Sequence, residues 1–325
     1  MVFLCILILI IGFVALIKGA DFFVDGSSAL AKNFKVPSLI IGLTIVALGT
    51  SAPEVAVSVT AALQGSNEIA ISNVVGSNIF NLLCVLGFCS IICPVPVERG
   101  ILKRDFPVSI VATVVIFLII GAGAVFSGEL FNMGMNDKVG SISRLAGLFL
   151  LICFAAYITY LVVDAIRHPI EEESIEQKPI WKCILFILLG LVLIVAGGQA
   201  VVYSAKEIAR AAGMSETLIG LTIVAFGTSL PELVTSIVAA KKGETGLAVG
   251  NVIGSNICNL MFILGTSSLI HPIAVNVASL YDVGMLIIIN LLTFIFAISK
   301  RSIKRGEGII MVVVYAAYII FAAVR

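Results

Sequence analysis

The sequence predicts an all-α membrane protein with ten transmembrane helices, built as two five-helix repeats of inverted topology. Three observations lead to this prediction: the composition, a duplicated motif and the distribution of basic residues. The chain of 325 residues is 60% hydrophobic and 12% charged, with a mean hydropathy of +1.18. Soluble domains are about a quarter charged, so lipid is the expected environment. The formal net charge of +1 gives no reason to expect a nucleic-acid partner.

A segment of 13 residues occurs twice, 178 residues apart. The copies are GLTIVALGTSAPE, which ends at Glu54, and GLTIVAFGTSLPE, which ends at Glu232, with 11 of the 13 positions identical. A second block repeats at the same offset, as NVVGSNIFN ending at Asn81 and NVIGSNICN ending at Asn259. Such self-similarity indicates two structural repeats. We place them at residues 1–163 and 181–325, joined by a linker at 164–180.

Ten stretches are long and apolar enough to cross a membrane, which takes about 20 residues of helix. The expected spans are 2–20, 38–63, 69–92, 107–126, 144–163, 181–203, 216–240, 247–270, 281–298 and 308–324. The first span has no basic residues before it and no clear cleavage site, so we expect a retained helix rather than a signal peptide. The connections between the spans are short.

Basic residues give the expected orientation, because cytoplasmic loops carry an excess of Lys and Arg. With ten spans, one side of the membrane holds 14 of these residues and the other side holds 5. We therefore expect a multi-pass cell-membrane protein with both termini outside and the 164–180 linker in the cytoplasm. Because five spans per repeat is an odd number, the second repeat enters the membrane from the opposite side. Inverted repeats of this kind are common among secondary transporters.

The second and seventh expected spans contain Gly and Pro next to the repeated glutamate. Pro53 and Pro231 have no N–H to donate to the carbonyl four residues earlier, so they weaken the helix there. Carbonyl groups freed within Ala47–Gly49 and Ala225–Gly227 can point into a cavity. Irregular backbone at this depth is tolerated where it lines a cavity or is buried in protein.

The side chains beside these breaks are oxygen donors. Ser51 lies three residues from Glu54, and Ser77 lies four residues from Asn81, so each pair is expected on one helix face. Over both repeats the candidate ligands are Thr50, Ser51, Glu54, Ser77, Asn81, Thr228, Ser229, Glu232, Ser255 and Asn259. A site made of oxygen, without His or Cys, favours hard cations such as Na⁺ and Ca²⁺ over zinc or copper.

Other polar residues in the spans are better explained by packing or by contacts between helices. Small hydroxyl residues often pack membrane helices, and we interpret Ser58, Thr113 and Ser236 in this way. Asn78 and Asn256 lie on a shifted face, so we expect them to cap or cross-link helices. A ligand role for these two asparagines stays open.

The two glutamates together carry a charge of −2 when both are ionised. One Ca²⁺ neutralises this charge, one Na⁺ does not, two Na⁺ balance it, and a third Na⁺ leaves the loaded site at +1. An empty pair of carboxylates in a low-dielectric site is unfavourable, and this opposes a conformational change without cargo. The same two carboxylates can share a proton, so H⁺ is expected to compete with the cations.

These motifs resemble a known family. GTSAPE and GTSLPE, each followed by GSNIxN, are similar to the two alpha-repeats of the sodium/calcium exchanger family, within the cation/calcium antiporter superfamily. The resemblance implies ten helices in two inverted halves, and Ca²⁺ exchanged for several Na⁺, usually taken as three. It implies that helices 1 and 6 slide across the core. It assigns the ion ligands to the ten side chains named above and to the carbonyl oxygens of Ala47 and Ala225.

The chain departs from the family pattern, or from its own symmetry, at a few points. Some relatives carry Asp where this chain has Asn259, a change associated with potassium-dependent transport, so Asn259 favours potassium independence. Ser72 stands where the second copy has Gly250, and the sequence offers no functional account of this difference. The short linker lacks a large regulatory insert, which resembles prokaryotic members.

The leading hypothesis is an electrogenic Na⁺/Ca²⁺ antiporter that works by alternating access, as a monomer and without a cofactor. The alternative is an antiporter of Ca²⁺ or another cation against H⁺, with the glutamates carrying the proton. A more distant alternative is a cation channel, although channels usually build the pore from several subunits. An intramembrane hydrolase would need Ser with His, or paired Asp, inside the spans. His168 and His271 lie at span ends, so we expect no enzyme.

Overall fold

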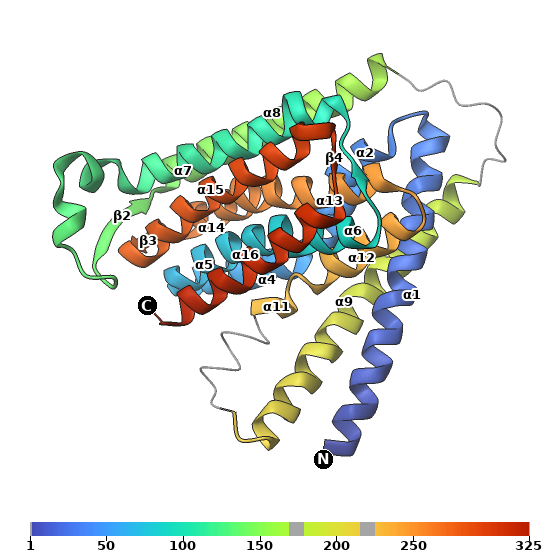
Figure 1. The fold of residues 1–325 in the computed structure, drawn as a ribbon, viewed down its shortest axis with the longest axis horizontal. Helices are drawn as coiled ribbons and strands as arrows, with labels where there is room; N and C mark the ends of the chain where they lie inside the picture. The colour runs from blue at the N-terminus through green and yellow to red at the C-terminus, as the bar shows by residue number, and fades with distance from the viewer. Residues whose placement is uncertain (1, 169–178, 215–224, 325) are drawn as a thin grey trace.

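The computed structural model describes residues 2–168, 179–214 and 225–324 and is dominated by long helices (Figure 1). Eight described helices are long and apolar enough to cross a membrane, and one bent pair of helices supplies a ninth candidate span. The predicted span at 216–240 lies partly outside the described residues. The chain is thus a multi-pass membrane protein, and the count of ten spans stays a prediction.

In the first repeat, the elements follow the order of the predicted spans. They are α1 (Val2–Phe34), α2 (Ser38–Ile41), the π-helical η1 (Gly42–Val46), α3 (Ala47–Thr50), α4 (Ala52–Leu63), α5 (Asn67–Phe80), the π-helical η2 (Asn81–Val85), α6 (Leu86–Ile92), β1 (Val95–Pro96), the π-helical η3 (Ile101–Asp105), α7 (Phe106–Ser127), the 3-10 helix η4 (Glu129–Asn132), β2 (Lys138–Ile142) and α8 (Arg144–Arg167).

Most elements described in the second half correspond to elements of the first, but η3 and η4 have no counterpart among the described residues. The described elements of the second half are α9 (Ile180–Ala211), α11 (Ala225–Gly227), α12 (Leu230–Lys241), α13 (Thr245–Ile257), the π-helical η6 (Cys258–Ile263), α14 (Leu264–Ile270), β3 (Ile273–Asn276), α15 (Val277–Lys300), β4 (Ser302–Ile303) and α16 (Arg305–Val324).

Helices α1 and α9 cross at glycines and run antiparallel along most of their length (Figure 1). A Cβ atom placed on Gly12 would lie 3.0 Å from the carbonyl oxygen of Gly197, and one placed on Gly19 would lie 2.9 Å from that of Gly190. Small residues at such a crossing let two backbones approach closely. Helix α1 continues past its predicted span together with this contact, because Gly26 still packs against the backbone of α9 at Cys183 and Ile187.

Short strands join loops of opposite repeats, which the sequence did not indicate. β1 pairs antiparallel with β4, and β2 pairs antiparallel with β3. β3 precedes α15 and β4 follows it, so the two pairs lie at opposite ends of this helix (Figure 1). Pairing between segments this far apart in sequence depends on how the two repeats dock, and a two-residue strand leaves no local pattern.

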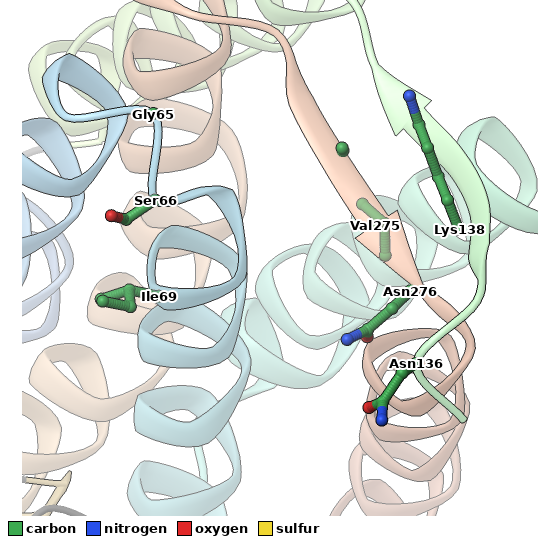
Figure 2. A pocket seen from close by; sticks show the side chains of 8 residues that line it. Gly65, Ser66, Ile69, Asn136, Lys138, Val275 and Asn276 are labelled. Carbon is green, nitrogen blue, oxygen red and sulfur yellow. The ribbon is translucent and has the colours of Figure 1, made fainter. Parts of the chain in front are cut away.

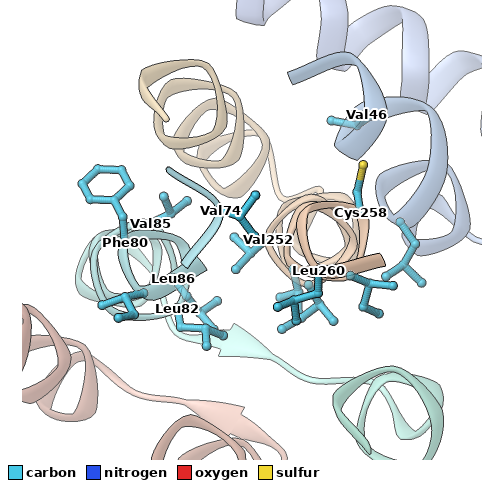
Figure 3. Close-up of a cluster of buried hydrophobic side chains, with 14 of the residues drawn as sticks. Val46, Val74, Phe80, Leu82, Val85, Leu86, Val252, Cys258 and Leu260 are labelled. Atoms are coloured by element: carbon cyan, nitrogen blue, oxygen red, sulfur yellow. The ribbon is translucent and has the colours of Figure 1, made fainter. Parts of the chain in front are cut away.

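The centre of the molecule is formed by the third span of each repeat. In the most apolar stretch of each helix, 78% of the residues are buried from α5 to α6 and 94% from α13 to α14, compared with 22% in α1. Figure 3 shows apolar side chains gathered between these two helices, among them Val74, Val252 and Leu260. The second block of the duplicated motif therefore lies at the most buried part of the fold.

Candidate cation site

The two repeated glutamates lie in the first turn of helices that follow a break. α4 begins at Ala52 and α12 at Leu230, and each helix has a proline in its first two positions. Proline fits there because the first N–H groups of a helix have no partner within it. The axis bends by 49° between residues 38–50 and 52–63. The predicted break is thus present in the second span, and the helix dipole favours negative charge at Glu54 and Glu232.

Each glutamate accepts a hydrogen bond from a serine hydroxyl group of the opposite repeat. Ser229 Oγ donates to Glu54 Oε1 at 2.9 Å, and Ser51 Oγ donates to Glu232 Oε1 at 3.1 Å. Ser77 Oγ, on α5, also donates to Glu54 Oε1 at 3.4 Å. The sequence spacing pairs Ser51 with Glu54, but α4 starts only after Ser51 and its hydroxyl reaches Glu232 instead. The two glutamates are therefore brought together across the interface between the repeats.

Four acceptor oxygens of the site are buried and have no hydrogen-bond donor among the described residues. They are Glu54 Oε2, Glu232 Oε2, Asn81 Oδ1 and Asn259 Oδ1. The other buried side-chain atoms without a partner are hydroxyl groups, including that of Thr228. A buried acceptor without a partner is unfavourable, and a carboxylate or amide oxygen can be satisfied only by a donor or a cation. These oxygens suit a hard cation such as Na⁺ or Ca²⁺.

Asn78 and Asn256 cross-link the two repeats rather than pointing at the glutamates. Asn78 Nδ2 donates to the carbonyl oxygen of Asn256 at 3.2 Å, and Asn256 Nδ2 donates to that of Asn78 at 3.4 Å. Asn256 Oδ1 accepts from Asn81 Nδ2 at 3.1 Å, and Asn78 Oδ1 accepts from Asn259 Nδ2 at 2.9 Å. These bonds engage the amide nitrogens of Asn81 and Asn259 and leave the oxygens available as ligands.

The remaining predicted site residues differ in the contacts that they make. The carbonyl oxygen of Ala47 accepts from Ser51 N at 3.1 Å and from Ser255 Oγ at 3.5 Å, so a cation would replace the long Ser255 bond to reach it. Thr50 Oγ1 lies within donor distance of the backbone carbonyl oxygens of Val46 and Ala47 and of the amide oxygen Oδ1 of Asn251 in the second repeat. Ala225 begins α11, at the edge of the described residues. The structure thus joins both repeats at one site, as the duplicated motif suggested.

Two asparagines that support the site were not singled out by the sequence reasoning. Asn73 Nδ2 donates to Ser58 Oγ at 2.9 Å and to the carbonyl oxygen of Glu54 at 3.2 Å. Asn251 Nδ2 donates to Ser236 Oγ at 2.9 Å and to the carbonyl oxygen of Glu232 at 3.4 Å. Each asparagine opens the second repeated block, and that position was the available signal.

One end of the bundle contains a cavity with a volume of about 400 Å³ (Figure 2). Ile69 lines it at the start of α5, while Lys138 and Asn276 line it from β2 and β3 (Figure 2). Along this side of α5, Ile69 is 53% exposed, Asn73 is half-buried and Ser77 is 3% exposed. This face of α5 therefore runs from the cavity, at Ile69, to Ser77, whose hydroxyl contacts Glu54.

The equivalent face of α13 is covered by the segment α2–η1–α3. A Cβ atom placed on Gly250 would lie 2.6 Å from the carbonyl oxygen of Leu39, and Gly254 is packed as tightly against η1. On α5 the corresponding positions are Ser72, which is exposed, and Gly76, where no described residue lies within 4 Å of an added Cβ. Among the described residues, a backbone faces Gly250 but not Ser72, which explains why a side chain is excluded at Gly250.

Gly250→Ser is expected to destabilise the protein, whereas the reverse change in the first repeat, Ser72→Gly, is expected to have little effect. The serine would drive α13 away from α2, and overpacking of this kind typically costs about 1–3 kcal/mol. Ser72 is exposed, so its replacement costs at most about 0.5–1 kcal/mol through the helix. The midpoint of thermal unfolding in detergent measures the stability of both variants. Equal midpoints for the two variants would mean that this close contact does not hold the repeats together.

Asn259→Asp is expected to change ion selectivity without preventing folding. The substitution adds a third carboxylate to the site, and an added negative charge attracts Ca²⁺ twice as strongly as Na⁺. We expect the preference for Ca²⁺ over Na⁺ to rise by about tenfold or more. Competition of Na⁺ and K⁺ against ⁴⁵Ca²⁺ binding measures the change, with size-exclusion chromatography as the test of folding. Unaltered selectivity in the folded variant would remove Asn259 from the ligands.

Comparison with known proteins finds relatives over the whole length of the chain. A family model described as sodium/calcium exchanger protein matches residues 4–163 and 182–324. A candidate antiporter, CaxA of Alkalimonas amylolytica, is 38% identical over 321 residues, 95% of each chain. The sodium/calcium exchanger MaX1 of Methanosarcina acetivorans is 34% identical over 343 residues, 97% of each chain. The solved structure of the sodium-calcium exchanger NCX_Mj, soaked with 10 mM Na⁺, gives a TM-score of 0.82 at 33% identity, covering 98% of this chain and 99% of that one.

The fold and the site define a membrane transporter, in which buried acidic and amide oxygens lie beside broken helices at the interface of two repeats. The family model and the relatives identify the kind of transporter. The chain belongs to the sodium/calcium exchanger family. This family consists of exchangers that move cations across a membrane, and it is not a family of enzymes.

Proposed function

We propose that this chain exchanges Ca²⁺ for several Na⁺ across the cell membrane by alternating access, and that the exchange is electrogenic. The main support is the set of buried acceptor oxygens on Glu54, Glu232, Asn81 and Asn259 that have no donor among the described residues. Each repeat supplies one carboxylate and one amide. The proposed ligands are these four side chains, the hydroxyl groups of Thr50, Ser51, Ser77, Thr228, Ser229 and Ser255, and the carbonyl oxygens of Ala47 and Ala225.

Charge neutrality explains why transport in one direction would require transport in the other. Glu54 and Glu232 are 1% and 0% exposed, and an unpaired buried charge is strongly unfavourable. One Ca²⁺ or two Na⁺ would neutralise the ionised pair. The empty site would resist closure around its two negative charges, so each change of access would carry cargo. This is the physical basis of obligate exchange.

We also propose an inverted arrangement of ten spans, with both termini outside and the 164–180 linker in the cytoplasm. Antiparallel packing of the equivalent helices α1 and α9 supports the inversion. The two strand pairs at opposite ends of α15 support it independently. Part of the linker, 169–178, lies outside the described residues. Because one chain contains both halves of the site, we expect a lipid-embedded monomer to be functional, without a cofactor.

Uptake of ⁴⁵Ca²⁺ into proteoliposomes tests the proposed exchange. Vesicles loaded with Na⁺ and diluted into Na⁺-free buffer should accumulate Ca²⁺, whereas vesicles loaded with choline should not. If three Na⁺ leave for each Ca²⁺ that enters, one net positive charge leaves. An inside-positive potential, set with K⁺ and valinomycin, should therefore accelerate uptake. A rate that does not respond to the potential would contradict electrogenic exchange.

The same vesicles distinguish the other hypotheses. Uptake that follows a pH gradient and is indifferent to Na⁺ would identify a cation/H⁺ antiporter, in which Glu54 and Glu232 carry the protons. A continuous conductance in planar bilayers, without a coupled second ion, would identify a channel. Labelling of single cysteines introduced at the C-terminus and in the linker, from each side of the membrane, tests the orientation.

A further inference from the structure

Lys242 caps the C-terminal end of α12, and its ammonium group contacts three oxygen atoms of α1. Its Nζ atom lies 2.8 Å from Asp25 Oδ1 and 3.3 Å from Asp21 Oδ1, and it donates to the backbone carbonyl oxygen of Asp21 at 3.2 Å. An ammonium group has three N–H donors, so these contacts can use all of them. Asp21 and Asp25 lie four residues apart and share one face of α1. The two carboxylates therefore converge on one cation that α12 supplies.

Helix α12 connects this ion pair to the candidate cation site. Glu232 lies in the first turn of α12 and Lys242 caps its end. The ten residues between them span about 15 Å of helix. Helix α1 also packs against α12. A displacement of α1 along α12 would therefore have to separate Lys242 from the two carboxylates, and α12 would carry any strain on this contact toward Glu232.

The first half of the chain has no charged counterpart of this contact. At the repeat offset of 178 residues, the three charged residues correspond to Gln199, Tyr203 and Gln64. Gln64 caps α4 as Lys242 caps α12. The architecture is thus repeated while the charges are not. An ion pair can form between α1 and α12, and none can form at the equivalent positions of α9 and α4.

The three charged side chains lie beyond the ends of the predicted spans 2–20 and 216–240, where water reaches them. Those of Asp21, Asp25 and Lys242 are 32%, 43% and 30% exposed. Salt screens exposed charges, and an exposed ion pair typically changes an equilibrium or a rate by about 1.5-fold to 5-fold. A contact of this strength adjusts a movement without blocking it.

We propose that Lys242 is a positioning residue that clamps α1 against α12 and thereby slows cation exchange. The ion pair stabilises the described arrangement of the two helices, so its separation adds to the barrier for moving α1. The inference rests on the proposed exchange function, in which α1 moves across the core. Because the clamp is exposed and ionic, high salt weakens it. Lys242 does not contact the cation ligands, so the clamp changes the maximal rate and leaves the apparent affinity for Ca²⁺ unchanged.

Initial rates of Na⁺-driven ⁴⁵Ca²⁺ uptake into proteoliposomes test the clamp, at low ionic strength and with choline chloride added on both sides. At low ionic strength, Lys242→Gln should have a maximal rate about 1.5-fold to 5-fold above that of the wild type, at the same half-saturating Ca²⁺ concentration. Added choline chloride should bring the wild type up to the rate of the variant. Lys241→Gln is the matched control, because Lys241 is the exposed neighbouring lysine, and it should behave like the wild type. Equal rates in Lys242→Gln and Lys241→Gln, or a slower Lys242→Gln, would overturn the proposal.

Two further variants distinguish a clamp from a role in folding. Lys242→Arg keeps the charge and should retain both the slow rate and its response to salt. Asp25→Asn removes the shorter contact from the side of α1, so it should also accelerate uptake, and it replaces Lys242→Gln if that variant does not fold. The double variant should be no faster than Lys242→Gln, because both changes act on one contact. A residue needed only for folding predicts slower uptake and a lower midpoint of thermal unfolding instead.

Transport by the wild-type chain separates this inference from the function on which it rests. Wild-type proteoliposomes that take up no ⁴⁵Ca²⁺ in response to a Na⁺ gradient would contradict the proposed exchange, and the clamp with it. Wild-type exchange together with equal rates in Lys242→Gln and Lys241→Gln would contradict the clamp alone.

Discussion

Glu54→Gln and Glu232→Gln are each expected to abolish Ca²⁺ transport while leaving the protein folded. Glutamine has almost the same shape, and its amide oxygen can still accept from the serine of the opposite repeat. The substitution lowers the charge of the ionised pair from −2 to −1. At an effective dielectric constant of about 20, one charge about 4 Å from a cation contributes about 4 kcal/mol per unit of cation charge. The dissociation constant for Ca²⁺ should therefore rise by about 1,000-fold or more.

Isothermal titration calorimetry and ⁴⁵Ca²⁺ uptake measure this loss. Glu307→Gln is the matched control. Glu307 lies away from the site, in the first turn of α16, and accepts from the backbone N–H of Lys304, the residue just before this helix. It should bind and transport Ca²⁺ like the wild type. Ca²⁺ affinity that persists in both Glu54→Gln and Glu232→Gln would show that the repeated acids do not hold the cation.

Gly190→Leu is expected to separate α1 from α9, destabilise the protein and stop transport. A Cβ atom on Gly190 would lie 2.6 Å from Phe23 N and 2.7 Å from the carbonyl oxygen of Gly19. Both neighbours are backbone atoms, so no side chain can rotate away to make room. The penalty should exceed the ~1–3 kcal/mol that is typical of overpacking by a side chain, because two helices that pack closely along three glycines of α1 must move apart.

Gly123→Leu is the control for this substitution. Gly123 lies within α7, is exposed, and has no described residue within 4 Å of an added Cβ. Leucine there should be neutral or slightly stabilising, because glycine is a poor helix former. The midpoint of thermal unfolding in detergent and the rate of Na⁺-driven ⁴⁵Ca²⁺ uptake should both fall for Gly190→Leu. Both should stay unchanged for Gly123→Leu. Wild-type stability in Gly190→Leu would mean that α1 and α9 are not held by their close approach.

Much of the fold was predictable because the signals are local. An apolar run of about 20 residues predicts a span wherever it occurs, and the described helices follow the predicted order. Pro53 marked the break in the second span for an equally local reason, since it removes one backbone donor. The candidate ligands were predictable because duplication set Glu54 and Glu232, with their neighbourhoods, apart from ordinary packing residues.

The contacts between the repeats were not predictable in the same way. Spacing pairs Ser51 with Glu54, yet the hydroxyl reaches Glu232, because a residue before the helix projects toward the opposite repeat. Asn78 and Asn256 could be ligands or cross-links by sequence, and the docking of α5 against α13 made them cross-links. The strand pairs likewise depend on segments that meet only when both repeats are folded.

The sequence by itself determined the membrane spans, the helix breaks and the two equivalent sets of oxygen donors, because hydropathy, proline chemistry and duplication act over short distances along the chain. The tertiary structure decided how the sets are joined, with each serine bound to the opposite glutamate. Local rules predict the same conformation for the two nearly identical motifs. Thr50 is bonded to Asn251 and Thr228 has no partner among the described residues, and identical local sequence does not predict this difference.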